Sequence, residues 1–269
     1  MTEYLYGFHV VEAVLTQAPQ RVRQLLLNAQ RGDARLSELD GLAQGAGVDI
    51  RRVAMTELGR LVGDVSHQGV VAEIEPAPEL DEEDLYERLA SMLGVDSHGT
   101  PRSDAAGLAK RSREAPLLLV LDEVTDPRNF GALLRVADGA GVHAVVTTRR
   151  NSPPLTAVVH KSSAGAALMV PIYRVTNLAR ALGRLQQLGV WLVGLDDAAA
   201  QLWHETDLRV ATALVLGAEG AGMRRLTREH CDLLVKLPMA GVAASLNVSV
   251  AAGVALYEAR RQRGAAAAR

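Results

Sequence analysis

The residues best suited to chemistry gather around a glycine turn in the C-terminal part of the chain. A short apolar run, 214–216, stops at Gly217, and Gly220 and Gly222 follow. Such a run is typical of a buried strand, and the glycines let the backbone turn without side-chain obstruction. A ligand can therefore approach this backbone closely. Because the spacing is neither G-x-G-x-x-G nor G-x-x-x-x-G-K-[ST], it favours neither a dinucleotide nor a P-loop nucleotide.

A second element that could position this turn follows it in the chain. Another short apolar run, 233–237, ends at Pro238. Ser245 is then the predicted N-cap of a helix that carries Leu246, Val250, Val254 and Tyr257. Small residues make this helix thin enough for close packing, and they are Ala244, Ala251, Ala252 and Gly253.

A third element lies upstream, where Asp126 and Pro127 predict the start of a helix that ends near 141. Asn129 falls in its first turn. Arg135 lies off its apolar stripe, on another face of the helix. The stripe, at helical spacing, consists of Phe130, Leu133, Leu134 and Ala137.

These three elements carry a family resemblance. The segments 126–141 (DPRNFGALLRVADGAG), 217–223 (GAEGAGM) and 237–258 resemble the signature motifs of the SpoU/TrmH branch of SPOUT RNA ribose methyltransferases. The stretch from 6–15 to 66–75 resembles the substrate-binding domain of bacterial members that methylate a 23S rRNA guanosine. Nearly the whole chain is covered, apart from a longer, divergent linker. The resemblance implies S-adenosylmethionine bound in a deep trefoil knot, and an obligate homodimer built on the C-terminal domain.

The resemblance also implies roles for individual residues. The backbones around Gly217, Leu237 and Leu246 would hold the adenine and ribose of S-adenosylmethionine. The catalytic set would be Asn129, Arg135, Glu219, Ser245 and Asn247. Within that set, Ser245 and Asn247 can equally be an ordinary N-cap and first-turn residue.

Ribose methylation needs an acceptor for the proton that leaves the 2'-hydroxyl. Arginine is normally protonated, so we expect Arg135, with Asn129, to position the ribose and phosphate and to stabilise developing negative charge. The acceptor would be a phosphate oxygen or Glu219. Alternatively, Glu219 organises the glycine turn through backbone amides, and we favour this second role.

The alternation of apolar runs and helical patterns predicts an α/β fold with a parallel sheet. We expect an N-terminal α/β domain at 1–76, which by resemblance is an L30e-like RNA-binding module. An acidic helix and flexible linker would occupy 77–115, and the methyltransferase domain 116–269. In relatives the turn at Lys161, Ser162 and Ser163 lies near the active site.

Composition limits the partners. With 269 residues and 48% hydrophobic content, the chain can bury a sizeable core. A net charge of -2 argues against general polyanion or DNA binding, so RNA affinity must come from local arginine clusters. Each cluster alone is also compatible with a solvated surface. The clusters contain Arg21, Arg23, Arg31, Arg35, Arg51, Arg52, Arg224, Arg225 and Arg228.

The remaining patterns predict absences. Cys231 is the single cysteine, and no Cys/His group has metal-ligand spacing, so we expect neither a disulfide nor a metal. No apolar window reaches about 18 residues, so we expect no membrane insertion and a cytoplasmic protein. The leading hypothesis is methylation of a guanosine ribose in the peptidyl-transferase loop of 23S rRNA. The alternatives are ribose methylation of tRNA or another rRNA nucleotide, and an inactive rRNA-binding assembly factor.

Overall fold

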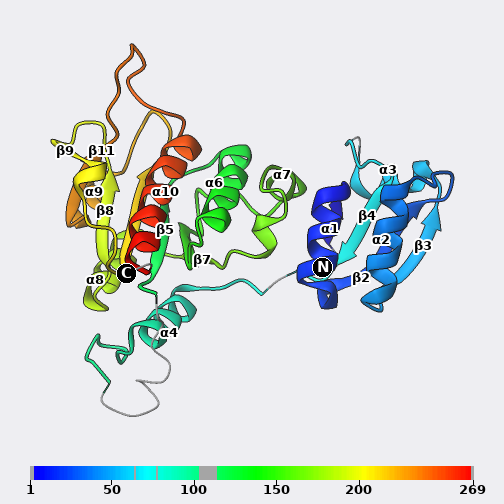
Figure 1. Cartoon of the computed structure of the whole chain (residues 1–269), viewed down its shortest axis with the longest axis horizontal. Helices are drawn as coiled ribbons and strands as arrows, with labels where there is room; N and C mark the ends of the chain where they lie inside the picture. Colours follow the sequence, from blue (N-terminus) through cyan, green and yellow to red (C-terminus); the bar gives the residue numbers. More distant parts are fainter. Residues whose placement is uncertain (1–2, 64, 77, 103–113, 268–269) are drawn as a thin grey trace. The chain divides into compact units, whose positions relative to one another are not determined.

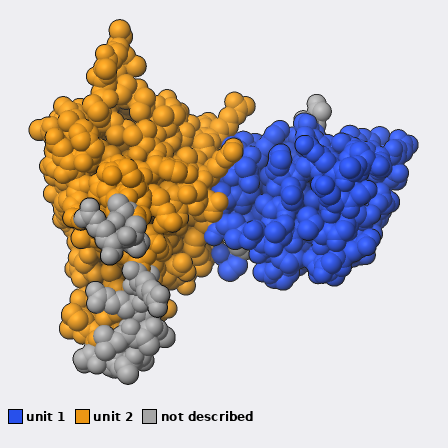
Figure 2. Space-filling view, viewed as in Figure 1, with its two compact units in different colours: residues 1–78, 154–169 blue, residues 79–153, 170–269 orange. Residues whose placement is uncertain are grey.

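The computed structural model describes residues 3–63, 65–76, 78–102 and 114–267. The chain divides into two compact units, coloured separately in Figure 2. Unit 1 comprises Met1–Pro78 and Pro154–Met169, and unit 2 comprises Glu79–Pro153 and Val170–Arg269. Each unit contains its own sheet.

Unit 1 is built on a four-stranded sheet of order β1-β4-β2-β3. β2 and β3 are parallel, whereas β4 is antiparallel to both β1 and β2. The elements are β1 (Glu3–Tyr6), α1 (Phe8–Gln17), η1 (Pro19–Arg21), β2 (Val22–Asn28), α2 (Ala34–Gly45), β3 (Asp49–Val53), α3 (Met55–Val62), β4 (Val70–Ile74), α7 (Ala157–Ser162) and η2 (Ala166–Leu168).

Unit 2 contains a seven-stranded sheet of order β7-β6-β5-β10-β8-β11-β9, in which every pair of neighbouring strands is parallel. The predicted α/β class with a parallel sheet is therefore confirmed. The unit consists of α4 (Glu82–Leu93), β5 (Leu117–Asp122), α6 (Pro127–Gly139), β6 (Ala144–Thr148), β7 (Ile172–Val175), α8 (Leu178–Gln187), β8 (Trp191–Leu195), β9 (Gln201–Leu202), η3 (Trp203–Glu205), β10 (Thr212–Gly217), α9 (Arg225–His230), β11 (Leu233–Lys236) and α10 (Val248–Ala267).

Helices cover both faces of this sheet, which explains why its central strands are unbroken apolar runs. Successive side chains of a strand point to opposite faces. Leu118 and Val120 of β5 accordingly join a buried cluster with residues of α4 and α8. On the other face α6 and α10 pack side by side (Figure 1). Among the described residues, no helix combines the length and the apolar character that crossing a membrane requires.

The acidic helix expected in the linker is α4, and it belongs to the core of unit 2. Asp81 caps it, since its carboxylate accepts hydrogen bonds from the N–H groups of Glu83 and Asp84. Leu85 and Leu89, one helical turn apart, are fully buried. These leucines form an apolar face that packs the helix on the sheet. The acidic composition of the segment made this face difficult to predict. Residues 103–113, the centre of the expected flexible linker, lie outside the described residues.

Candidate active site

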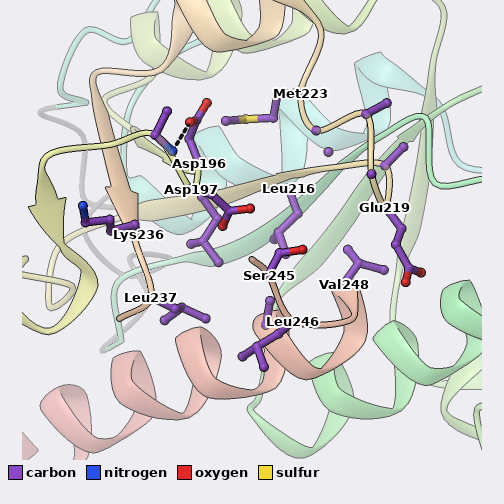
Figure 3. Close-up of a pocket in the computed structure, with 18 of the residues that line it drawn as sticks. Asp196, Asp197, Leu216, Glu219, Met223, Lys236, Leu237, Ser245, Leu246 and Val248 are labelled. Carbon is purple, nitrogen blue, oxygen red and sulfur yellow. Dashed lines mark hydrogen bonds between the residues drawn. The ribbon is translucent and has the colours of Figure 1, made fainter. Parts of the chain in front are cut away.

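A pocket of about 360 Å³ opens at the carboxyl ends of β8, β10 and β11 in unit 2 (Figure 3). Three segments distant in the sequence form most of its wall. They follow β8 at 195–198, follow β10 at 216–223, and run from the end of β11 into α10. The carboxyl edge of a parallel sheet is where open α/β proteins bind ligands, and this volume is typical of small-molecule sites.

The glycine turn forms one wall because it folds tightly on itself. A Cβ atom on Gly217 would lie only 2.0 Å from the carbonyl carbon of Gly222, so no larger residue fits there. Gly222 donates its N–H to the carbonyl of Ala218 at 2.8 Å, which closes the turn. Gly220 and Gly222 have φ values of 78° and 68°, in the left-handed region that favours glycine. The backbone itself is therefore the surface offered to a ligand.

Apolar side chains form a second part of the wall. Leu237 and Leu246 lie in the lower part of Figure 3, and Leu216 and Val248 line the same pocket. The structure thus brings together all three residues predicted to bind the cofactor, Gly217, Leu237 and Leu246, on one pocket. Such a wall suits a flat apolar group whose polar edge bonds to the neighbouring backbone.

Charged side chains also line the pocket, and the sequence patterns missed most of them. Asp196 and Asp197 follow β8, and Lys236 ends β11. Asp196 is held by Arg228, with 3.1 Å between Oδ2 and Nε. The signal that could have found these residues is their position immediately after apolar strands, at the edge where the turn also lies.

A cluster of three polar side chains, Asn129, Glu219 and Asn247, adjoins the pocket. Asn129 Nδ2 donates to Glu219 Oε2 at 3.0 Å. Asn247 Nδ2 donates to Asn129 Oδ1 at 3.0 Å and to Glu219 Oε2 at 3.3 Å. The Glu219 carboxylate thus accepts hydrogen bonds from side-chain amides. No hydrogen bond to the turn's backbone amides is seen among the described residues, contrary to the role that we favoured.

The start of α10 differs from the prediction. The helix begins at Val248, and Asn247 Oδ1 accepts hydrogen bonds from the N–H of Ser249 at 3.0 Å and from its hydroxyl at 2.6 Å. Asn247 is therefore the residue that caps α10, and the expectation that Ser245 caps it is wrong by two positions. The reason is that the chain still forms the pocket wall at Ser245 and Leu246 before it turns into the helix.

Arg135 stands apart from the pocket, on the exposed surface of α6. As predicted, Asp126 caps this helix by accepting the N–H of Asn129, and the stripe from Phe130 to Ala137 is buried. Six residues separate Arg135 from Asn129, about 9 Å along a helix axis. Within the described part of the chain its guanidinium has no hydrogen-bond or ion-pair partner, so its charge is available to a ligand.

Two further groups do not line the pocket. The sulfur of Cys231 packs against Gly194 of β8, and burial raises the pKa of its thiol to about 12, which favours the neutral thiol over the nucleophilic thiolate. Lys161, Ser162 and Ser163 belong to unit 1 and line no part of the pocket. In that unit, the neighbouring buried His160 lies 3.0 Å from Glu3.

Comparison with known proteins identifies the class. The model of the SpoU rRNA Methylase family matches residues 116–257, which hold the pocket and the polar cluster. A second family model, described as RNA 2'-O ribose methyltransferase substrate binding, matches residues 4–80. The chain therefore belongs to the SpoU rRNA methylase family, as its motifs indicated.

Relatives of known activity match over nearly their full length. The 23S rRNA (guanosine-2'-O-)-methyltransferase RlmB of Pseudomonas aeruginosa is 48% identical over 261 residues, which are 97% of each chain. The enzyme of the same name from Escherichia coli K12 is 42% identical over 98% of this chain and 100% of its own. A crystal structure of an RNA 2'-O ribose methyltransferase superimposes with a TM-score of 0.73 at 25% identity, covering 97% of this chain and 89% of that one.

Proposed function

We propose that this protein is an S-adenosylmethionine-dependent methyltransferase that modifies the ribose 2'-hydroxyl of a guanosine in 23S rRNA. The activity and substrate follow from the full-length match to enzymes named for that reaction. The observation that carries the chemistry is the cluster of Asn129, Glu219 and Asn247, which joins three separate segments at the pocket. We place the target in the peptidyl-transferase loop and the reaction in the cytoplasm.

The pocket fits S-adenosylmethionine. Leu237 and Leu246 would pack on the adenine, and the backbone after Gly217 would bond its edge, since Gly220 and Gly222 carry no side chain that obstructs the approach. Carboxylates of Asp196, Asp197 and Glu219 in the wall suit the positive charges of the ligand. When bound, this cofactor supplies an electrophilic methyl group on a sulfonium.

The polar cluster then acts on the ribose. Asn129 and Asn247 each donate an N–H to the Glu219 carboxylate. These two hydrogen bonds hold the carboxylate in position at the pocket wall. From there Glu219 can accept the proton of the 2'-hydroxyl, the role that the side-chain contacts favour over organising backbone amides. Arg135, which has no side-chain partner among the described residues, would bind the adjacent phosphate and stabilise charge that develops on the oxygen.

Unit 1 would select the RNA. The match of residues 4–80 to a substrate-binding family supports this division, as does the separation of unit 1 from the pocket-bearing unit. We propose that unit 1 is the L30e-like RNA-binding domain and that residues 116–269 carry catalysis, with the segment between them connecting the two. α4 would then be a part of the connection that is docked on the catalytic sheet.

We propose a homodimer formed through unit 2. α10 presents a stripe of exposed apolar residues, Val250, Val254 and Tyr257, at the spacing of one helix face. Exposed apolar stripes of this kind are typical of subunit contacts. We expect sedimentation to give a dimer at micromolar concentration and Val254→Arg to give a monomer. A wild-type monomer in the presence of cofactor would contradict the proposal.

We also propose that the chain around the pocket is knotted. The support is that segment 237–247, between β11 and α10, lines the same pocket as the turn at 217–223. β11 lies two strands away from β10, yet α10 packs on α6. A crystal structure in which 237–247 passes outside the loop formed by the preceding chain would exclude the knot.

The decisive test is to map ribose methylation in cells that lack this protein. We expect one guanosine in the peptidyl-transferase loop of 23S rRNA to lose its methyl group, and the purified protein with labelled S-adenosylmethionine to restore it. Loss at a tRNA or another rRNA position would favour the first alternative. Unchanged methylation, together with RNA binding, would favour an inactive assembly factor.

A further inference from the structure

A second cleft opens along the same edge of the sheet in unit 2. It occupies about 530 Å³ at the carboxyl ends of β5, β6 and β7, whereas the candidate cofactor pocket lies at the ends of β8, β10 and β11. The chain that leaves β10 contributes to both, because Met223 lines the cofactor pocket and Arg224 lines the second cleft. Nothing in the proposed chemistry uses this cleft.

The charge of the cleft is positive. Three arginines, Arg150, Arg224 and Arg225, line it together with one carboxylate, Glu123. Arg224 is held in place by the fully buried Asp122, with 2.7 Å between Nε and Oδ1, and by Glu123 at 3.2 Å. Within the described residues, the side chain of Arg150 has no hydrogen-bond or ion-pair partner. Arg150 therefore brings an uncompensated cation into the cleft.

Backbone donors add to this charge. The first two residues of α8, Leu178 and Ala179, line the cleft. Asn177 caps the helix by accepting the N–H of Arg180 at 3.1 Å. The N–H groups of Leu178 and Ala179 have no partner inside the helix, and the helix dipole places partial positive charge there. The cleft thus combines the guanidinium of Arg150 with amides at the start of α8, which is the chemistry that binds phosphate.

The walls of the cleft are fixed. Glu123 and Asn151 follow neighbouring strands, and both adopt φ 58°, in the left-handed region. Asn151 Nδ2 donates to Glu123 Oε1 at 3.0 Å, which ties the two strand ends together. Glu123 in turn bonds Arg224. The one carboxylate of the cleft is thus occupied by protein partners.

We propose that this cleft binds a phosphodiester of the RNA substrate beside the target nucleotide, with Arg150 as its main side-chain contact. The inference rests on the proposed function, which supplies RNA as the substrate. An RNA strand laid along the carboxyl edge of the sheet reaches both openings, so one phosphate in the second cleft would fix the register of the ribose at the first. Arg150 is then a positioning residue.

The test compares three variants of the full-length protein that each lower the charge by one. Arg150→Ala removes the free cation. Ala179→Asp places a carboxylate in the cleft at a helix start, where it should keep or raise the stability of α8. Arg209→Ala is the control, because Arg209 pairs with Asp207 just before β10, at the opposite edge of the sheet. Binding of a 23S rRNA fragment that contains the unmethylated target loop is measured over a range of salt concentrations.

We expect Arg150→Ala and Ala179→Asp to weaken RNA binding and to reduce the slope of log K against log salt by about 1. Arg209→Ala should keep the wild-type slope, and all variants should keep the wild-type affinity for S-adenosylmethionine. Arg150→Lys should recover part of the binding, since a lysine also pairs with phosphate. Thermal melting verifies that each variant is folded.

Two results would overturn the assignment. One is an unchanged salt slope in both cleft variants. That result would show that no phosphate binds in the cleft, even if the affinity for RNA fell because a contact with a base was lost. The other is equal weakening by Arg209→Ala, which would indicate only a general effect of net charge. Failure of the proposed function looks different, because wild type would then not methylate the RNA, whatever the variants do.

Discussion

At the scale of single residues, Arg135 can be separated from both the fold and the cofactor pocket. Its side chain is exposed, off the buried stripe of α6, and lines no part of the pocket. We expect Arg135→Ala to lower single-turnover methyl transfer by about 100-fold or more, because a positioned charge at the reacting ribose is lost. Stability should change by less than about 0.5 kcal/mol. Cofactor affinity, measured by calorimetry, should stay at the wild-type value.

Two further variants serve as controls for this experiment. Arg135→Lys should not restore transfer, because an ammonium cannot reproduce the planar guanidinium fork. Arg209→Ala, an equal loss of charge at the other edge of the sheet, should transfer normally. Near-normal transfer by Arg135→Ala would remove this residue from the mechanism, and a parallel fall in melting temperature would make its role structural.

The glycine turn is an element whose backbone must pass through a space with no room for a side chain. Gly217→Ala would put a Cβ atom 2.0 Å from the carbonyl carbon of Gly222, and backbone cannot swing aside as a long side chain can. We expect a loss of about 1–3 kcal/mol in stability and a large loss of cofactor affinity, since the turn must open. Melting curves and calorimetry measure both.

The matched control for that change is Gly241→Ala. Gly241 lies in the neighbouring segment between β11 and α10, and nothing lies within 4 Å of a Cβ atom built on it. Its variant should melt and bind cofactor as wild type does. If Gly217→Ala did the same, the turn would be looser than the structure implies.

α10 is fastened to the sheet by one buried arginine. Arg263 is 6% exposed, and burial lowers the pKa of its guanidinium. It donates to the carbonyls of Leu208 at 2.9 Å, Val210 at 2.7 Å and Pro116 at 3.3 Å, which precede β10 and β5. Arg263→Leu should cost about 1–3 kcal/mol or more of unfolding free energy, because these carbonyls lose their donor.

Arg260→Leu provides the comparison on the same helix. Arg260 pairs with Glu114, and its side chain is 52% exposed. Exposed pairs contribute at most about 1 kcal/mol, so this variant should unfold at nearly the wild-type denaturant concentration. Equal unfolding curves for the two variants would refute the anchoring role of Arg263.

At the scale of the whole molecule, truncated chains can test whether RNA selection and cofactor binding belong to different parts of the protein. A chain of residues 79–269 keeps α4, whose Leu85 and Leu89 are fully buried in unit 2. We expect it to fold and to bind S-adenosylmethionine, yet to methylate 23S rRNA poorly because residues 1–78, the larger part of unit 1, are missing. A chain of residues 115–269 should be less stable, since each buried leucine removed costs about 2–5 kcal/mol.

Melting, calorimetry and single-turnover transfer on both truncated chains provide the measurements. Transfer by residues 79–269 at the full-length rate would show that unit 1 does not select the substrate. Equal stability of the two chains would show that α4 contributes nothing to the stability of unit 2, although its leucines are buried.

Local sequence patterns predict the elements that short-range chemistry defines. The apolar run 214–216 predicts the buried strand β10, and Asp126-Pro127 with the stripe from Phe130 predicts α6 nearly to the residue. These predictions succeed because backbone hydrogen bonding, capping and helical periodicity act over a few residues. The glycines after β10 likewise predicted a backbone turn, and the motifs indicated the family.

Which distant groups meet depends on the packing of the whole chain. Asn129, Glu219 and Asn247 form one hydrogen-bonded cluster because α6 and α10 pack together beside the turn after β10. The same packing brought Asp196 and Lys236 into the pocket and started α10 at Val248. Such contacts depend on strand order, and strand order follows from how the whole sheet buries its apolar faces, which no local pattern records.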